Sequence, residues 1–221
     1  MQTPRPLRWN CGRIRGAAAL LLLPLLAGLT GCQAFAFGAV MWGKEPTKTI
    51  VADYPYLTEQ EVCVVVRADM ETLFEYPQVQ WEVADHVRVA LEKHIEGVTV
   101  VEPRRVTDFQ RRDPSWESID PAKLGKRFEA TRLLEIALTQ YTTREPESPH
   151  LYRGYISATI SVYNTDYPES EPVYTKGVQT VYPPNSPGAW GSGDQAIRRA
   201  TMEAFAEDVA GKFYDRTVKA D

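Results

Sequence analysis

Cysteine thiols are the side chains in this sequence whose setting most clearly indicates a reaction. Cys32 ends the segment Leu29-Thr30-Gly31-Cys32, directly after an apolar run. A thiol is nucleophilic and can carry a covalently attached acyl chain, and each buried methylene of such a chain contributes about 0.8 kcal/mol to membrane binding. The segments around Cys32 therefore decide which modification this thiol is expected to carry.

The residues before Cys32 have the order of an export signal. The leader contains four arginines and no acidic residue. It is followed by an apolar segment from Ala17 to Leu29, roughly 13 residues long. As a helix this segment reaches only about 20 Å, which is too short for a hydrocarbon core of about 30 Å. We therefore expect a signal peptide over residues 1–31, cleaved before Cys32, rather than a permanent membrane helix that runs on through Met41.

The segment Leu29-Thr30-Gly31-Cys32 resembles the lipobox of bacterial lipoprotein precursors, in which signal peptidase cuts before a diacylglyceryl-modified cysteine. This resemblance implies a palmitate-carrying lipoprotein whose mature N-terminus is Cys32. Residue 33 is Gln, whereas an aspartate there often retains enteric lipoproteins at the inner membrane. We therefore expect a protein anchored to the outer membrane and facing the periplasm, with the outer leaflet of the inner membrane as the alternative.

The other two cysteines predict no intrachain disulfide. Cys11 lies in the leader, and Cys63 lies in the apolar run Val62–Val66. With Cys11 removed and Cys32 lipidated, Cys63 has no cysteine left to pair with in its own chain. We expect Cys63 to be buried and to behave as a small hydrophobic side chain, and an intermolecular disulfide is the alternative.

The charge balance makes nucleic acid an improbable ligand. The whole chain has a formal net charge of −4, and the leader holds four of its 25 Lys and Arg residues but none of its 29 Asp and Glu residues, so the mature chain is at about −8. An acidic protein lacks the surplus of cations that displaces counterions from phosphates. We expect no nucleic-acid partner.

Apolar periodicity in the mature chain predicts a tether over residues 32–60 and a single α/β domain over residues 61–221. The expected elements are strands over 62–66, 98–102, 133–143, 152–164 and 173–182, and helices over 77–96, 121–130 and 194–214. Residues 152–164 alternate between apolar and polar, as expected for a sheet that is covered on one side. The predicted fold is an α/β (α+β) two-layer sandwich, with a mixed sheet of about five strands, helices on one face and the order β-α-β-α-β-β-β-α.

This order behind a lipobox resembles the envelope lipoproteins that include the curli secretion lipoprotein CsgG, the penicillin-binding-protein activator LpoB and the N-terminal domain of TolB. The residues that carry the resemblance are Val62–Val66, the helix Val83–Ile95, Val98–Val101 with Arg104-Arg105-Val106, the strand Leu133–Thr143, and the hairpin over 152–182 with its closing helix. The long pore-forming insertions of CsgG have no counterpart here. The resemblance implies a periplasmic scaffold or regulatory module rather than a channel.

The residues that commonly perform catalysis do not converge in this sequence. His86 and His94 are eight residues apart, about 80° around a helix, and are expected to be exposed rather than to bind a metal together. No Gly-x-Ser-x-Gly elbow occurs, and strand alternation places Glu135 on the solvent face. We predict no catalytic residue, metal site or cofactor, and therefore not an enzyme. An envelope hydrolase or a small-ligand-binding lipoprotein with an unrecognised site is the alternative.

Two segments are candidates for binding a partner. Arg104, Arg105, Arg111 and Arg112 are dense positive charge in an acidic chain, in a predicted loop over 104–118. This cluster is either a solvated loop or a contact patch for an anionic partner. Phe37 and Trp42 in the tether suit a lipid interface, and a partner-binding segment is the alternative. We predict a non-enzymatic scaffold or regulatory module that binds an envelope protein or a second copy of itself.

Overall fold

The computed structural model describes residues 47–145, 148–185 and 193–219 of the 221-residue chain, without the side chains of residues 149 and 150. The predicted signal peptide, Cys32, Phe37 and Trp42 lie outside these residues. Contacts divide the chain into two units, and the larger one, Thr49–Val218, contains the main sheet and every helix of the described residues. The strands are β1 (Thr47–Ile50), β2 (Glu61–Arg67), β3 (Thr99–Val100), β4 (Arg132–Glu145), β5 (Ser148–Asn164), β6 (Tyr174–Tyr182) and β7 (Arg216–Lys219). The helices are α2 (Met70–Glu75), α3 (Val79–His94), α4 (Pro103–Arg112), α5 (Pro121–Arg127), α6 (Asp194–Ala210) and the short 3-10 helix η1 (Trp116–Ser118).

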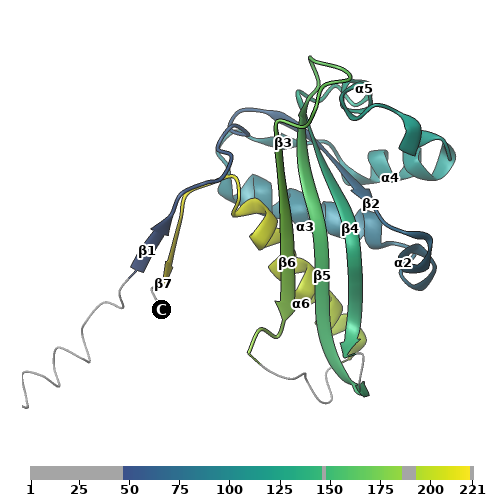
Figure 1. Ribbon diagram of the computed structural model, residues 1–221, viewed down its shortest axis with the longest axis vertical. Coiled ribbons are helices and arrows are strands. Elements are labelled where there is room, and N and C mark those ends of the chain that lie inside the picture. The colour runs from purple at the N-terminus through teal and green to yellow at the C-terminus, as the bar shows by residue number, and fades with distance from the viewer. Residues whose placement is uncertain (1–46, 146–147, 186–192, 220–221) are drawn as a thin grey trace, which may run out of the picture. The chain divides into compact units, whose positions relative to one another are not determined.

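The main sheet has five strands in the order β3-β2-β4-β5-β6 (Figure 1). Strand β2 pairs in parallel with β3 and with β4, whereas β4, β5 and β6 form an antiparallel meander. A separate two-stranded sheet pairs β1 with β7. The prediction of an α/β fold with a mixed sheet of about five strands is confirmed.

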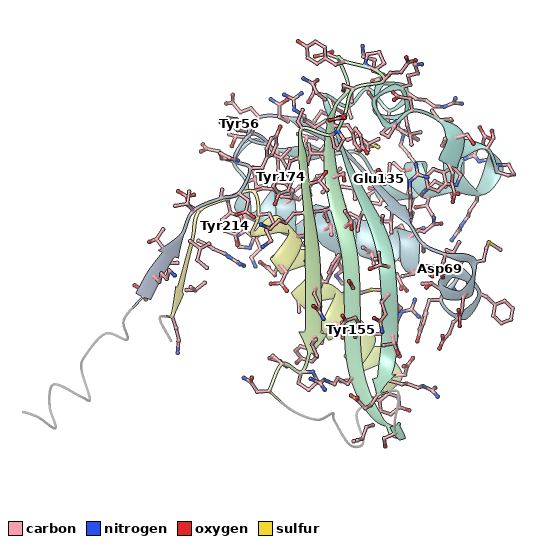
Figure 2. All side chains as sticks on the ribbon, in the orientation of Figure 1. Tyr56, Asp69, Glu135, Tyr155, Tyr174 and Tyr214 are labelled. Carbon is pink, nitrogen blue, oxygen red and sulfur yellow. The ribbon has the colours of Figure 1, made fainter. Side chains whose placement is uncertain are left out.

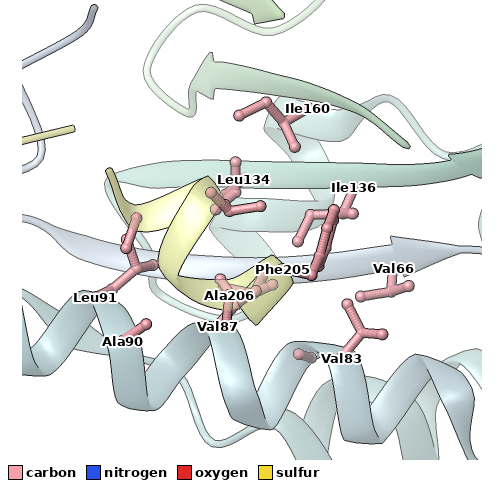
Figure 3. Close-up of a cluster of buried hydrophobic side chains, with 14 of the residues drawn as sticks. Val66, Val83, Val87, Ala90, Leu91, Leu134, Ile136, Ile160, Phe205 and Ala206 are labelled. Atoms are coloured by element: carbon pink, nitrogen blue, oxygen red, sulfur yellow. The ribbon is translucent and has the colours of Figure 1, made fainter. Parts of the chain in front are cut away.

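Helices α3 and α6 cover one face of the sheet, where they form the main core (Figure 3). Phe205 of α6 and Leu91 of α3 are fully buried there against Ile160 of β5 and other inward-facing strand residues. Helix α6 approaches the sheet closely at Gly154 of β5, where an added Cβ would lie only 1.8 Å from the Oγ1 atom of Thr201. Gly154 is therefore required for the helix to reach the sheet.

The second face of the sheet is also partly covered, so the prediction of helices on one face only is wrong. Residues of β2 and β4 that point away from α3, such as Cys63 and Leu133, pack in a second core with Trp116, Leu124 and Phe128 from η1, α5 and the residue after α5. The physical reason is the apolar run of β2, which exposes apolar side chains on both faces and needs cover on each.

Helix α4 replaces the loop that the sequence predicts over 104–118. Pro103 occupies the start of the helix, where its missing N–H costs no hydrogen bond. Val106, Thr107 and Gln110 form the buried side of α4, and two of these three residues are polar. Apolar periodicity alone does not show a helix whose buried side is largely polar. Toward the N-terminal end of the described residues, Leu57 is fully buried, and Thr49–Val218 forms one compact unit.

The environment of Cys63 makes its thiol unreactive. The side chain is fully buried, and burial raises the pKa of Cys63 to about 12, although the charge of Arg105 opposes this shift. Since the thiolate is the nucleophile, we expect the native lipidated protein to resist a thiol reagent such as dithionitrobenzoate and to react only in urea. Ser115→Cys, at an exposed position, is the control that should react at once. Fast labelling of native protein, or a dimer that a reductant dissolves, would contradict this prediction.

Candidate functional site

The four arginines singled out in the sequence lie on the exposed side of α4. We call Arg104, Arg105, Arg111 and Arg112 the α4 arginine surface. Residues seven positions apart on a helix point in nearly the same direction. Arg104 and Arg111 therefore form one row and Arg105 and Arg112 form a second row beside it. Asp108 lies between the two pairs along the helix. The structure thus brings together the residues that the sequence proposed as a partner-binding cluster.

Two buried amides hold α4 and α3 in place at the end of β2. The side chains of Gln80 on α3 and Gln110 on α4 both donate from Nε2 to the carbonyl oxygen of Val66, over 3.0 Å and 3.1 Å. A carbonyl oxygen has two lone pairs and can accept both bonds. Because buried hydrogen bonds are costly to break, this shared acceptor fixes the two helices relative to each other and to the sheet.

The α4 arginine surface places four arginines on one helix, without carboxylate partners among the described residues. Within the described part of the chain, none of its four guanidinium groups forms an ion pair with a carboxylate. Arg112 donates from Nε to the backbone oxygen of Asp108, over 3.1 Å. Five other arginines pair with acidic side chains: Arg67 with Glu135, Arg88 with Asp85, Arg153 with Glu145, Arg198 with Glu82 and Arg199 with Glu203. Helix α4 carries four arginines against the single carboxylate of Asp108, so it has a net positive charge.

A small cavity opens between the start of α3 and α4. It has a volume of about 210 Å³. Its lining residues are Gln78, Trp81, Arg104, Thr107, Asp108 and Arg111. Only one row of the α4 arginine surface lines it, because Arg105 and Arg112 point elsewhere on the helix. The four arginines therefore divide into two that reach the cavity and two that do not.

Trp81 forms a wall of this cavity and positions one of its arginines. The guanidinium carbon of Arg104 lies 4.9 Å from the centre of the Trp81 ring, which is the geometry of a cation–π contact. The indole Nε1 of Trp81 is buried and has no hydrogen-bond partner among the described residues. Thr107 is already satisfied, since its hydroxyl donates to the carbonyl oxygen of Pro103 over 2.8 Å. The cavity thus has two cations in its lining, and one of them, Arg104, is positioned by the Trp81 ring.

The histidines do not form a metal site in the described part of the chain. His94 is half-buried rather than exposed as predicted: its ring stacks on Tyr214, and its Nε2 lies 2.7 Å from the Oε2 of Glu207. Burial alone would raise the pKa of Glu207, but hydrogen bonds and charge from Lys93 and His94 outweigh it and lower the pKa. No group of three His, Cys, Asp or Glu residues within the described ranges could hold a metal ion. His94 and Glu207 therefore link α3 to α6.

Glu135 lies on β4 (Figure 2), and the prediction from strand alternation that it faces solvent is wrong. Its side chain is only 13% exposed and pairs with the guanidinium of Arg67. Arg67 in turn lies over the ring of Trp116, 4.8 Å from its centre. The second core layer covers this part of the sheet, so the carboxylate is used in an internal ion pair.

Sequence reasoning missed the residues that α3 contributes to the cavity. Gln78 is the N-cap residue of α3, and Trp81 lies in its first turn. An aromatic side chain at a position that the apolar stripe of the helix does not use is the signal that could have identified Trp81. Its pairing with Arg104 depends on packing between helices and is not visible in the sequence.

No helix of the part of the chain that the structure describes is both long enough and apolar enough to cross a membrane.

The comparisons with known proteins return similar structures but no family. No family model and no curated protein matches the sequence, so the resemblance to the CsgG, LpoB and TolB family stays a prediction. The PelC dodecamer from Paraburkholderia phytofirmans is similar at 8% identity, over 76% of this chain and 98% of that chain, with a TM-score of 0.45. Lipoprotein GNA1162 from Neisseria meningitidis is similar at 15% identity, over 62% and 89%, with a TM-score of 0.41. A minor lipoprotein from Acinetobacter baumannii is similar at 12% identity, over 71% and 92%, with a TM-score of 0.34. Two of these three are lipoproteins, and likeness at this level is no evidence of a shared partner or activity.

Proposed function

We propose that this chain is a non-enzymatic lipoprotein of the bacterial cell envelope that binds an acidic protein partner through the α4 arginine surface. The observation that carries the proposal is the set of four exposed arginines on one helix, which have no carboxylate partner in the described structure although the mature chain is at about −8. The lipobox ending at Cys32 supports a lipid anchor, and Gln33 in place of an aspartate favours the outer membrane, facing the periplasm. The acidic partner is either another envelope protein or a second copy of this chain, which would bind through its own acidic surface.

The energetics of exposed charge favour a role in binding over a role in stability. Exposed arginines contribute little to folding, since ion pairs at the surface are worth about 0–1 kcal/mol and salt screens them. Charges of one sign at an interface instead raise the rate of association with a complementary face and exclude wrong partners. The α4 arginine surface is therefore expected to act in encounter with a partner.

The proposal is tested by replacing Arg104, Arg105, Arg111 and Arg112 with serine in the intact lipidated protein. Chemical crosslinking in cells should recover a specific envelope protein with the unchanged chain and lose it with the fourfold variant. The melting temperature should fall by only a few degrees, because serine is a slightly poorer helix former than arginine. Binding of the unchanged protein should weaken as salt is raised.

A second fourfold variant has the same change in charge at other places: Lys93→Ser, Lys123→Ser, Lys176→Ser and Arg199→Ser, whose side chains are all more than half exposed. It should retain the crosslinked partner. If both variants lose it equally, net charge rather than α4 is responsible. If neither loses it, the α4 arginine surface is solvated and the proposal is wrong.

A further inference from the structure

We infer that the cavity between α3 and α4 is a subsite for one carboxylate group of the acidic partner, such as a single Asp or Glu side chain. The inference rests on the proposed function, because the same helix supplies the cations, and it adds a defined contact to a general attraction. It predicts that Arg104 and Arg111, which line the cavity, bind the carboxylate directly. Arg105 and Arg112 do not line the cavity and contribute only general attraction.

The size of the cavity decides what it can hold. Its volume of about 210 Å³ lies below the range of about 300–1,000 Å³ that is typical of pockets for whole drug-sized ligands. At about 30 Å³ for each water of liquid, it has room for about seven waters. The space therefore fits one side chain or one small anion rather than a whole cofactor.

The charge inside the cavity favours a group with a single negative charge. Arg104 and Arg111 contribute two positive charges, and the carboxylate of Asp108 removes one. A carboxylate balances the remaining charge, whereas a doubly charged phosphate does not. Asp108 also repels a second negative group, so the subsite is expected to select one acidic side chain from an acidic face.

The donors that would hold a carboxylate are partly preorganised. The contact of Arg104 with the Trp81 ring restricts the guanidinium while leaving its N–H groups free at the edge, and a restricted arginine loses less entropy when it binds. The side-chain amide of Gln78 also lines the cavity, and it makes no capping bond at the start of α3. Each of these groups donates hydrogen bonds, which is what a carboxylate accepts.

The Trp81 indole gives a direct test by NMR, because its ring is a wall of the cavity. Full-length lipidated protein labelled with ¹⁵N-tryptophan is placed in nanodiscs and titrated with sodium acetate, sodium phosphate or sodium chloride at equal ionic strength. Trp81→Phe assigns the resonance, and the Trp116 indole in the second core serves as a reference for intact folding. Acetate should move the Trp81 resonance along a saturating curve, and chloride should leave it in place.

The matched variants separate the subsite from the surface around it. Arg104→Ser/Arg111→Ser should weaken acetate binding by about tenfold or more, as expected for the loss of charge-assisted hydrogen bonds. Arg105→Ser/Arg112→Ser removes the same charge from the same helix and should change it by less than about twofold. Equal weakening in both variants, no response of Trp81 to acetate, or phosphate that binds more tightly than acetate would each overturn the inference, the last in favour of a phosphate ligand.

The two proposals fail in different ways. If acetate binds the cavity but the fourfold serine variant keeps its crosslinked partner, the subsite stands as a carboxylate site and the proposed function is wrong. If the partner is lost in that variant but acetate leaves Trp81 unchanged, the proposed function stands and the subsite is wrong.

Discussion

Replacing Phe205 with alanine is expected to lower the free energy of unfolding by about 3–5 kcal/mol. Phe205 is fully buried in the core between α6 and the sheet, where α3 also packs (Figure 3). Removing the ring loses its burial and leaves a cavity, because a core closed by two helices and a sheet collapses only in part. Urea denaturation followed by circular dichroism measures the change.

The matched control is Phe74→Ala, which is the same substitution at a surface position. Phe74 lies on α2 and is 90% exposed. It should change the free energy of unfolding by less than about 0.5 kcal/mol. A cost at Phe205 no larger than that at Phe74 would show that α6 does not close the sheet as described. A large cost at Phe74 would show instead that α2 is covered in the protein in solution.

The sheet and its two long helices could be predicted because their residues repeat with a clear period. The alternation in residues 152–164 shows which side chains of β5 face the core, and the apolar stripe of α6 shows the same for that helix. The side chains to be buried follow from these two patterns. Helix α4 could not be found in this way, since Thr107 and Gln110 occupy its buried side and are held by hydrogen bonds to Pro103 and Val66. The bond of Thr107 stays within α4, whereas the bond of Gln110 depends on where β2 lies, which the sequence pattern does not show.

The candidate site was predictable to the extent that it is local in the sequence. Four arginines within nine residues indicate a charged surface whether the segment is a loop or a helix. The division of those arginines into two rows requires the helix, and the cavity requires Trp81, which comes from a helix more than twenty residues earlier. Composition therefore indicates the charge, while only the packing of α3 against α4 indicates a pocket.

Replacing Cys32 with serine is expected to abolish incorporation of radiolabelled palmitate and to leave the precursor uncleaved. The prediction rests on the lipobox Leu29-Thr30-Gly31-Cys32, since a serine hydroxyl is a far weaker nucleophile than a thiol and does not accept the lipid. The readouts are palmitate labelling and the mass of the intact protein, which together report lipidation and cleavage.

The other cysteines provide the controls that make the assignment to Cys32 specific. Cys63→Ser removes a fully buried thiol and Cys11→Ser removes one from the leader, and both variants should keep normal labelling and cleavage. Membrane attachment alone is a poorer readout, because an uncleaved apolar segment of about 20 Å retains some affinity for a bilayer although it does not span one. Acyl chains bind far more strongly, since about 0.8 kcal/mol for each methylene adds up over several chains. Palmitate that persists in Cys32→Ser, or disappears in Cys63→Ser, would place the lipid on another residue and remove the basis for an envelope anchor at Cys32.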